Sequence, residues 1–196
     1  MSNYKVEVFS KDSYELGEGP HWDGTSQYLY FVDIFKGSAY RLDTTNKNVE
    51  KLDVDDENEN LSVIIPCQND KNQFIISRGS KLVKANWVTK SSQVFDKVDT
   101  DKDGNRFNDG KCDAKGRLWV GTMGNEYKPG FVQPDKGALY CLDDFGQISK
   151  KVPNISLSNG LTWSIDNKKM FYIDSAKRII YVFDFDLESG NLCKSS

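Results

Sequence analysis

Short runs of β-branched and aromatic residues recur along the chain, and glycine, asparagine or aspartate bounds each of them. Four such runs lie at residues 29–33, 73–77, 118–121 and 170–174. Runs of this length and composition are typical of β-strands. No segment of a dozen residues carries the apolar stripe and the caps of an amphipathic helix. The pattern therefore predicts an almost entirely β protein.

The runs are evenly spaced. We take as a marker the residue just before the Asp, Ser or Gly that ends each run. The four markers are Val32, Ile76, Val120 and Ile173. Their separations are 44, 44 and 53 residues, and the longest interval contains a loop-like insert at 124–136. A second strand-like segment follows each run, at 39–43, 81–85, 138–143 and 180–184. A repeat of about 40 to 50 residues with several strands per unit indicates a β-propeller.

Four markers in 196 residues predict about four blades. A ring of four blades is uncommon, and residues 184–196 have the pattern of a strand and a turn that lead into another strand. We therefore expect residues 1–196 to form a single β-propeller domain that is truncated at its C-terminus. An incomplete ring would leave blade faces open and strand edges unpaired, so we expect this chain on its own to be unstable or prone to aggregation.

Composition excludes several classes of function. The 26 lysines and arginines against 29 acidic residues give a net charge of −3, without the basic excess of a protein that binds nucleic acid or an anionic membrane. No stretch approaches the roughly 18 apolar residues of a membrane span, and the N-terminus has no apolar signal region. The four cysteines lack C-x-x-C spacing, which indicates reduced thiols and a cytoplasmic protein. A single histidine, His21, disfavours zinc modules and Ser-His-Asp catalysis.

Two segments resemble known motifs but lack required residues. Residues 99–104 begin like an EF-hand calcium loop, but the twelfth position is Gly110 instead of glutamate. Residues 104–111 have five residues between two glycines where a phosphate-binding loop has four. We interpret residues 99–104 as an acidic turn.

Three polar segments, which we expect at turns, are better candidates. They lie at 17–22, 105–111 and 158–163, each about 10 to 15 residues before a marker. Equivalent positions in successive repeats lie at the same end of a propeller, so these segments should converge near the axis. Oxygen ligands from Glu18 and Asn159 suit a hard divalent cation, although two ligands do not complete a site. Ordinary solvated turns remain the alternative for each segment.

Several segments together resemble a known family. They are Gly-Glu-Gly-Pro-His-Trp at 17–22, Asn-Arg-Phe-Asn-Asp-Gly-Lys at 105–111, Ser-Asn-Gly-Leu at 158–161 and Phe-Tyr-Ile-Asp-Ser at 171–175. The chain is similar in these segments to the regucalcin family, also called senescence marker protein 30 or gluconolactonase-like, which includes the insect luciferin-regenerating enzymes. The resemblance implies a six-bladed β-propeller with one divalent cation at its axis. Calcium is the first candidate, and zinc, manganese or magnesium are the alternatives.

The resemblance also implies roles for individual residues. Glu18 and Asn159 match metal ligands, while Arg106, Asn108 and Glu126 match residues that contact the substrate. In the family, a third ligand comes from the aspartate of a Pro-Asp-Gly motif, which also acts as the catalytic acid and base. That motif would fall beyond Ser196, so the resemblance places no catalytic residue within this chain and implies that the chain alone is inactive.

The implied reaction is the metal-dependent hydrolysis of a sugar lactone, which is a carboxylic ester. A cation can polarise the lactone carbonyl and position a water molecule, and a carboxylate can act as general base toward that water. Arg106 and Asn108 can orient the substrate through its hydroxyl groups. Two alternatives remain open: a calcium-binding regulatory protein and a luciferin-regenerating enzyme.

Overall fold

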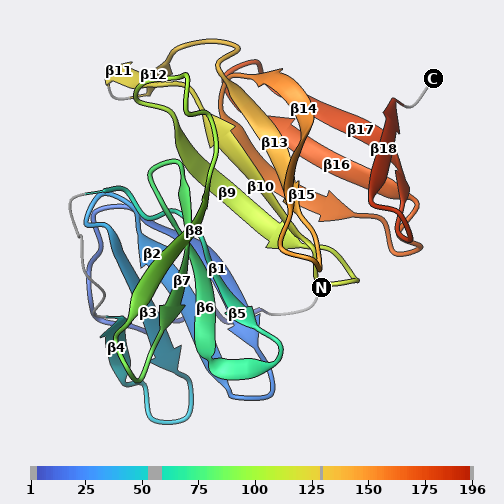
Figure 1. Ribbon diagram of the computed structural model, residues 1–196. Coiled ribbons are helices and arrows are strands. Elements are labelled where there is room, and N and C mark those ends of the chain that lie inside the picture. Colours follow the sequence, from blue (N-terminus) through green and yellow to red (C-terminus); the bar gives the residue numbers. More distant parts are fainter. Residues whose placement is uncertain (1–3, 53–58, 129, 195–196) are drawn as a thin grey trace.

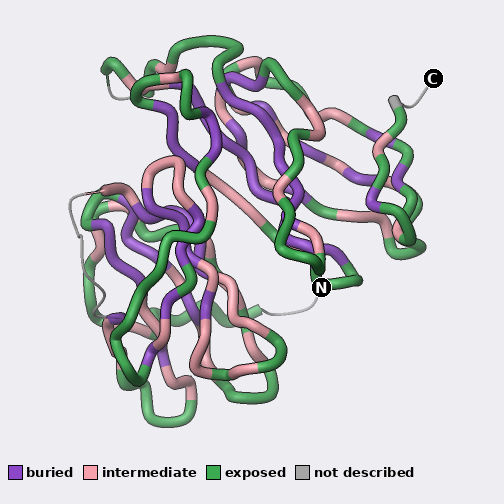
Figure 2. Tube along the Cα trace, in the orientation of Figure 1, coloured by how far each residue is buried: buried purple, intermediate pink, exposed green. Residues whose placement is uncertain are grey.

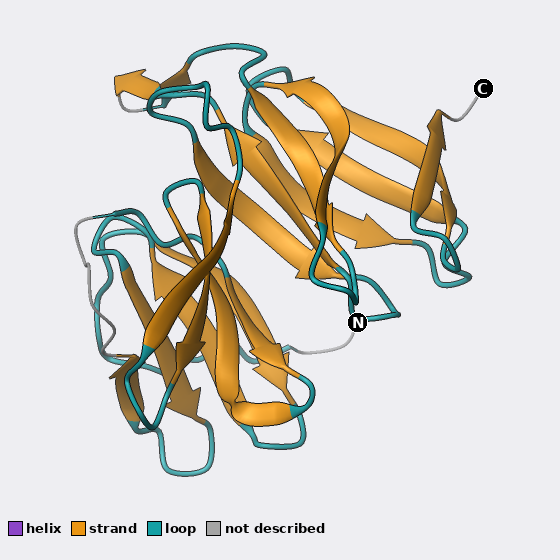
Figure 3. Ribbon diagram, viewed as in Figure 1, coloured by secondary structure: helices purple, strands orange, loops and turns teal. Residues whose placement is uncertain are grey.

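The computed structural model describes residues 4–52, 59–128 and 130–194. Within these ranges the regular elements are all strands, which form four antiparallel sheets of four strands each and one small sheet of two strands (Figures 1 and 3). The same ranges contain no helix that is long and apolar enough to cross a membrane. The all-β prediction and the prediction of about four propeller blades are therefore confirmed.

The four sheets follow one another along the chain and are called blades 1 to 4. Blade 1 contains β1 (Gly17–Asp23), β2 (Tyr28–Asp33), β3 (Ser38–Asp43) and β4 (Val49–Leu52). Blade 2 contains β5 (Ile64–Cys67), β6 (Asp70–Arg78), β7 (Lys81–Asn86) and β8 (Ser92–Lys97). Blade 3 contains β9 (Arg106–Cys112), β10 (Leu118–Met123), β13 (Gly137–Leu142) and β14 (Ile148–Ile155). Blade 4 contains β15 (Ser158–Trp163), β16 (Lys169–Asp174), β17 (Ile179–Asp186) and β18 (Asn191–Lys194).

The repeat predicted from spacing matches the structure. All four marker residues lie on the second strand of their blade, which is β2, β6, β10 or β16. The insert at 124–136 joins β10 to β13, and its described part carries a small hairpin of β11 (Glu126–Lys128) and β12 (Phe131–Val132). The strand expected near the end of the chain is β18, and residues 195–196 lie outside the described part.

Three hydrophobic clusters lie between successive blades. The first joins Val32 of blade 1 to Phe74 of blade 2, and the third joins Trp119 of blade 3 to Tyr172 of blade 4. Val120 follows Trp119 on β10 but belongs to the second cluster, between blades 2 and 3. Because successive side chains of a strand point to opposite faces, β10 is buried on both sides. Figure 2 shows this burial as purple segments along the central strands.

The residue after a marker fixes the start of the first strand in three blades. The Asp33 carboxylate accepts hydrogen bonds from the backbone N–H groups of Glu15 (2.9 Å) and Leu16 (3.1 Å). Asp174 accepts the equivalent bonds from residues 156–157 in blade 4, and the Ser77 hydroxyl accepts them from residues 62–63 in blade 2. These bonds satisfy buried acceptors and hold the segments that lead into β1, β5 and β15.

The four cysteines all lie in the described part and are free thiols. Burial raises the pKa of Cys112 to about 12 and that of Cys141 to about 11. Both thiols therefore stay protonated near neutral pH, as expected for buried cysteines without a catalytic role.

Candidate functional site

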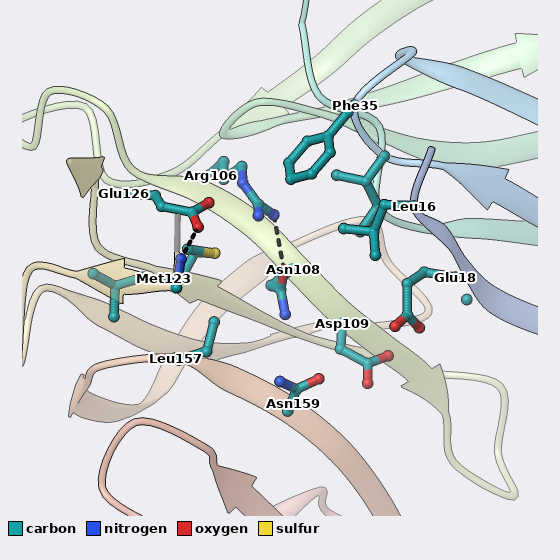
Figure 4. A pocket seen from close by; sticks show the side chains of 14 residues that line it. Leu16, Glu18, Phe35, Arg106, Asn108, Asp109, Met123, Glu126, Leu157 and Asn159 are labelled. Atoms are coloured by element: carbon teal, nitrogen blue, oxygen red, sulfur yellow. Dashed lines mark hydrogen bonds between the residues drawn. The ribbon is translucent and has the colours of Figure 1, made fainter. Parts of the chain in front are cut away.

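The first strands of blades 1, 3 and 4 meet around one cavity of about 190 Å³ (Figure 4). Glu18 on β1, Asn108 on β9 and Asn159 on β15 line this cavity. Arg106 at the start of β9 and Glu126 on β11 line it as well. The structure therefore brings together all five residues that the sequence singled out. Their roles as ligands and substrate contacts stay predictions.

The three polar segments lie on strands, which corrects the expectation that they form turns. The ladder shifts register just after Glu18 in β1 and just after Asn159 in β15. In β9 the register skips Asn108, which has no partner on β10. Each irregularity is a β-bulge, which inserts an extra residue and redirects nearby side chains. Gly19, in the bulge of β1, adopts a φ of +58°, a conformation that glycine tolerates. Residue types that are typical of turns therefore lie at bulges in these strands.

The amide of Asn159 is held in one orientation. Its Nδ2 donates a hydrogen bond to the Ser175 hydroxyl at 3.0 Å. This bond uses the nitrogen side of the amide, so Oδ1 faces the cavity, on the side of Asp109 in Figure 4. An amide oxygen fixed in this way is a suitable ligand for a hard cation.

Asn108 and Arg106 hold each other in place. Arg106 Nη1 donates hydrogen bonds to Asn108 Oδ1 (2.8 Å) and to the carbonyl oxygen of Phe107 (2.9 Å). Asn108 Nδ2 donates to the carbonyl oxygen of Ser158 on the neighbouring blade at 2.7 Å. Burial lowers the pKa of Arg106, and the nearby Glu126 carboxylate opposes this shift. The Arg106 guanidinium remains a cation with unused N–H groups.

Glu126 reaches the cavity from the β11–β12 hairpin. Its Oε1 accepts a hydrogen bond from the backbone N–H of Gly130 at 2.7 Å. This bond uses one of the two carboxylate oxygens of Glu126. Arg106 and Glu126 therefore place a cation and an anion near each other at the edge of the cavity, where both can bind polar groups.

Asp109 is a site residue that the sequence analysis missed. It lines this cavity and also the neighbouring one, and it lies between Glu18 and Asn159 in Figure 4. Burial raises the pKa of the Asp109 carboxyl, and the Glu18 carboxylate raises it further. Adjacent strand residues normally point to opposite faces, so alternation argues against Asn108 and Asp109 sharing a cavity. The bulge in β9 allows Asn108 and Asp109 to face the same cavity. In the sequence, the only signal for this role is that an acidic residue directly follows Asn108.

These groups form a donor set that fits a hard cation. The carboxylates of Glu18 and Asp109 and the amide of Asn159 line the same part of one cavity. Two neighbouring carboxylates repel each other, and a divalent cation between them would relieve that repulsion. In the described ranges, no group of three or more His, Cys, Asp or Glu residues could hold a metal ion. A cation at this position would therefore depend on amide oxygens as well as carboxylates.

The fold and the cavity together define a class of protein. The chain is a β-propeller whose first strands direct carboxylates, amides and one guanidinium into an axial cavity. Comparison with known proteins then gives the family. The family described as SMP-30/Gluconolactonase/LRE-like region matches residues 16–196, so the chain belongs to that family. The resemblance stated from the sequence motifs is therefore confirmed.

Curated relatives support the same assignment. The regucalcins of Pongo abelii and Homo sapiens are each 35% identical to this chain over 192 residues. Each alignment covers 98% of this chain and 62% of the relative. The chain thus spans a little under two thirds of the length of these curated relatives.

Solved structures share the fold. A luciferin-regenerating enzyme superposes with a TM-score of 0.85 at 33% identity, over 92% of this chain and 59% of that one. The calcium-binding regucalcin of Agrobacterium tumefaciens gives a TM-score of 0.83 at 21% identity, over 96% of this chain and 60% of the other. A gluconolactonase of Xanthomonas campestris gives 0.69 at 16% identity, over 92% and 61% of the two chains. The last two similarities concern the fold alone.

Proposed function

We propose that the chain carries metal-binding and substrate-binding residues of a divalent-metal-dependent hydrolase that acts on sugar lactones. One observation carries this proposal: Glu18, Asp109 and Asn159 line the same cavity as the Arg106 guanidinium. Membership in the SMP-30/gluconolactonase family supports lactone hydrolysis, and the oxygen donors of the cavity suit a calcium ion.

The proposal includes a six-bladed ring. Four blades make up about two thirds of such a ring, and the chain spans 62% of the length of the curated relatives. The proposed aspartate of a Pro-Asp-Gly motif would then join Glu18 and Asn159 as a ligand and act as the catalytic acid and base. The described residues supply the rest of the site.

A cation bound at this site would act as a Lewis acid toward the lactone carbonyl. The residues of this chain would bind and orient the substrate. Arg106 has guanidinium N–H groups beyond the two bonds of Nη1, and these can donate to substrate oxygens. The Glu126 oxygen that Gly130 does not use can accept a hydrogen bond from a substrate hydroxyl. Such paired contacts hold the ring ester in one orientation over Glu18 and Asn159.

Two measurements on the protein at its full natural length test this proposal. Calorimetry would follow calcium binding, and a pH-indicator assay would follow the hydrolysis of glucono-δ-lactone. We expect Glu18→Ala and Asn159→Ala each to abolish both signals, because each removes an oxygen from the donor set. Glu188→Ala serves as the control, since this glutamate side chain is 79% exposed in blade 4. Hydrolysis that survives in both ligand variants would show that the reaction does not depend on this site.

The same measurements separate the alternatives. Calcium binding that is lost in Glu18→Ala, without hydrolysis of any lactone by the wild type, would favour a calcium-binding regulatory protein. The similarity to a luciferin-regenerating enzyme supports the other alternative. Formation of a luciferin precursor from oxyluciferin by the wild type would favour it.

A further inference from the structure

Arg106 and Glu126 line the same cavity but lie on different elements. Arg106 begins β9, whereas Glu126 lies on the hairpin of the insert at 124–136. The ladders that join β10 to its neighbours stop before this insert, because β9 pairs with β10 only as far as Met123 and β13 pairs with β10 only as far as Leu139. Contacts outside these ladders must therefore hold the insert beside Arg106.

Asn105 supplies two of these contacts. Its Nδ2 donates hydrogen bonds to the carbonyl oxygen of Lys136, at the end of the insert, and to Asp99 Oδ2, both at 2.9 Å. The Lys102 ammonium donates to the same Lys136 carbonyl oxygen at 2.6 Å. Because Asn105 directly precedes Arg106 in the chain, these bonds join the start of β9 to the end of the insert.

Gly104 reaches the other end of the insert. It has a φ of +77°, and a Cβ atom at this position would lie 2.5 Å from Cγ of Asn125, the residue before Glu126. The Gln133 N–H donates to the carbonyl oxygen of Asn125 at 2.9 Å and closes the base of the hairpin. The backbone just before β9 therefore contacts the insert at both of its ends.

The surroundings of Asn105 fit a positioning role. The residue is only 7% exposed, and its Oδ1 is buried without a hydrogen-bond partner in the described ranges. A buried acceptor without a partner destabilises the folded state. The contribution of this amide therefore comes from the two bonds of its Nδ2, one of which holds the insert.

We infer that Asn105 is a positioning residue that holds the Glu126 hairpin at a fixed distance from the Arg106 guanidinium. This inference rests on the lactone hydrolase proposed above, in which Arg106 and Glu126 both contact the substrate. A lactone that bonds to both side chains needs them at one separation, and a small displacement of either would misorient its ring ester. Asn105 is not among the residues that line the cavity, so it acts through Glu126.

Hydrolysis of glucono-δ-lactone by the full-length protein tests this role. We expect Asn105→Ala to lower kcat by about 10- to 100-fold. Calcium affinity should stay unchanged, because Asn105 is not part of the donor set. In a Glu126→Ala background the same substitution should have little further effect, because the group that it positions is already absent. Val83→Ala is the control for lost stability, since Val83 is 3% exposed in blade 2, and it should keep the wild-type kcat.

A second variant, Gly104→Ala, tests the same coupling from the other end of the insert. Its added Cβ must displace Asn125 and with it Glu126, so kcat should fall as in Asn105→Ala. Gly146→Ala is the matched control, because Gly146 has the same φ of +77° and its added Cβ would meet nothing within 4 Å. Equal activity in the two glycine variants would show that contact with the insert does not matter and would overturn the inference.

The outcomes distinguish this inference from the proposal beneath it. An equal fold-loss on Asn105→Ala with and without Glu126, or a loss of calcium binding in Asn105→Ala, overturns the inference and leaves the lactonase intact. If the wild type hydrolyses no lactone, the lactonase proposal fails, and amide hydrogen exchange then tests the positioning by itself. The Gln133 amide should lose most of its protection in Asn105→Ala but not in Val83→Ala. Protection that is unchanged, or that is lost equally in both variants, overturns the inference.

Discussion

At the scale of single residues, neighbours outside the cavity decide which atoms face it. Asn159 can present either its oxygen or its nitrogen, and the Ser175 hydroxyl takes the nitrogen. Mutation of a group that hydrogen-bonds to a metal ligand and orients it commonly lowers metal affinity by about 10- to 100-fold. Ser175 is therefore a positioning residue in the proposed calcium site.

We expect Ser175→Ala to weaken calcium binding about tenfold, because the Asn159 amide loses the bond that directs Oδ1 into the cavity. Titration calorimetry on the full-length protein measures this change. Ser92→Ala, on the exposed β8 strand of blade 2, should bind calcium like the wild type. An unchanged affinity in Ser175→Ala would mean that other contacts set the amide orientation.

A second residue-scale feature is the buried carboxylate of Asp99. It accepts hydrogen bonds from the Tyr140 hydroxyl (2.6 Å) and the Thr122 hydroxyl (2.7 Å), and from the Asn105 amide at 2.9 Å. The Lys102 ammonium lies 3.3 Å away. Burial acts to raise the pKa of Asp99, but these hydrogen bonds and Lys102 together bring it below its usual value. The network ties the segment before β9 to blade 3.

A carboxyl whose pKa falls on folding stabilises the native state at pH values above its unfolded pKa, which is about 3.9. This stabilisation is lost as the pH falls through the lower, folded pKa. We therefore expect urea unfolding to show falling stability below about pH 4, and Asp99→Asn to reduce that dependence. At pH 7 the variant should be less stable by about 1 to 3 kcal/mol, because an amide nitrogen replaces one acceptor oxygen and leaves a buried donor without a partner. Identical pH profiles for the two proteins would contradict this role.

At the scale of elements, blades 3 and 4 approach each other closely at Gly121. A Cβ atom there would lie 2.4 Å from the Ser158 side chain on β15 and 2.6 Å from the Tyr172 hydroxyl on β16. Both neighbours are fully buried, so neither can move aside easily. The glycine of the Gly-Thr-Met segment thus allows blades 3 and 4 to pack directly.

We expect Gly121→Ala to lower the free energy of unfolding by about 1 to 3 kcal/mol through overpacking. Gly24→Ala is the matched control, because its added Cβ would meet only the Trp22 indole at 3.5 Å. That control should stay within about 0.5 kcal/mol of the wild type. Urea unfolding of the three proteins provides the comparison. Equal unfolding midpoints would show that the interface accommodates the added methyl group.

The sequence predicted the blades better than it predicted the strands around the axis. Runs of β-branched and aromatic residues such as 73–77 recur at an almost constant spacing, so the repeat and the blade count could be derived. The axial strands contain Gly19, Asn108 and Asn159 at bulges, and these residue types are also typical of turns. Local sequence cannot distinguish the two, because a bulge is defined by the partner strand. Asp109 was missed for the same reason.

At the scale of the whole molecule, both ends of the row of blades carry apolar faces. An open groove of about 640 Å³ crosses blade 1, and Trp22 and Phe31 are among the residues that line it. On blade 4, Ile180 is 62% exposed and Val182 is 40% exposed, next to Ile173 and Phe171 of the neighbouring strand. Apolar patches of this kind favour association with other surfaces.

We therefore expect the 196-residue chain, produced by itself, to self-associate at micromolar concentration. Ile180→Lys should reduce this association, because a charge on an outward-facing strand opposes packing against an apolar surface. Ile165→Lys makes the same chemical change at a fully exposed turn of the same blade and should leave association unchanged. Sedimentation velocity over a range of concentrations measures the distribution for all three chains. A wild type that sediments as a monomer at every concentration would show that the exposed apolar faces do not drive association. An equal decrease of association in both lysine variants would show that net charge, and not the blade 4 face, causes the effect.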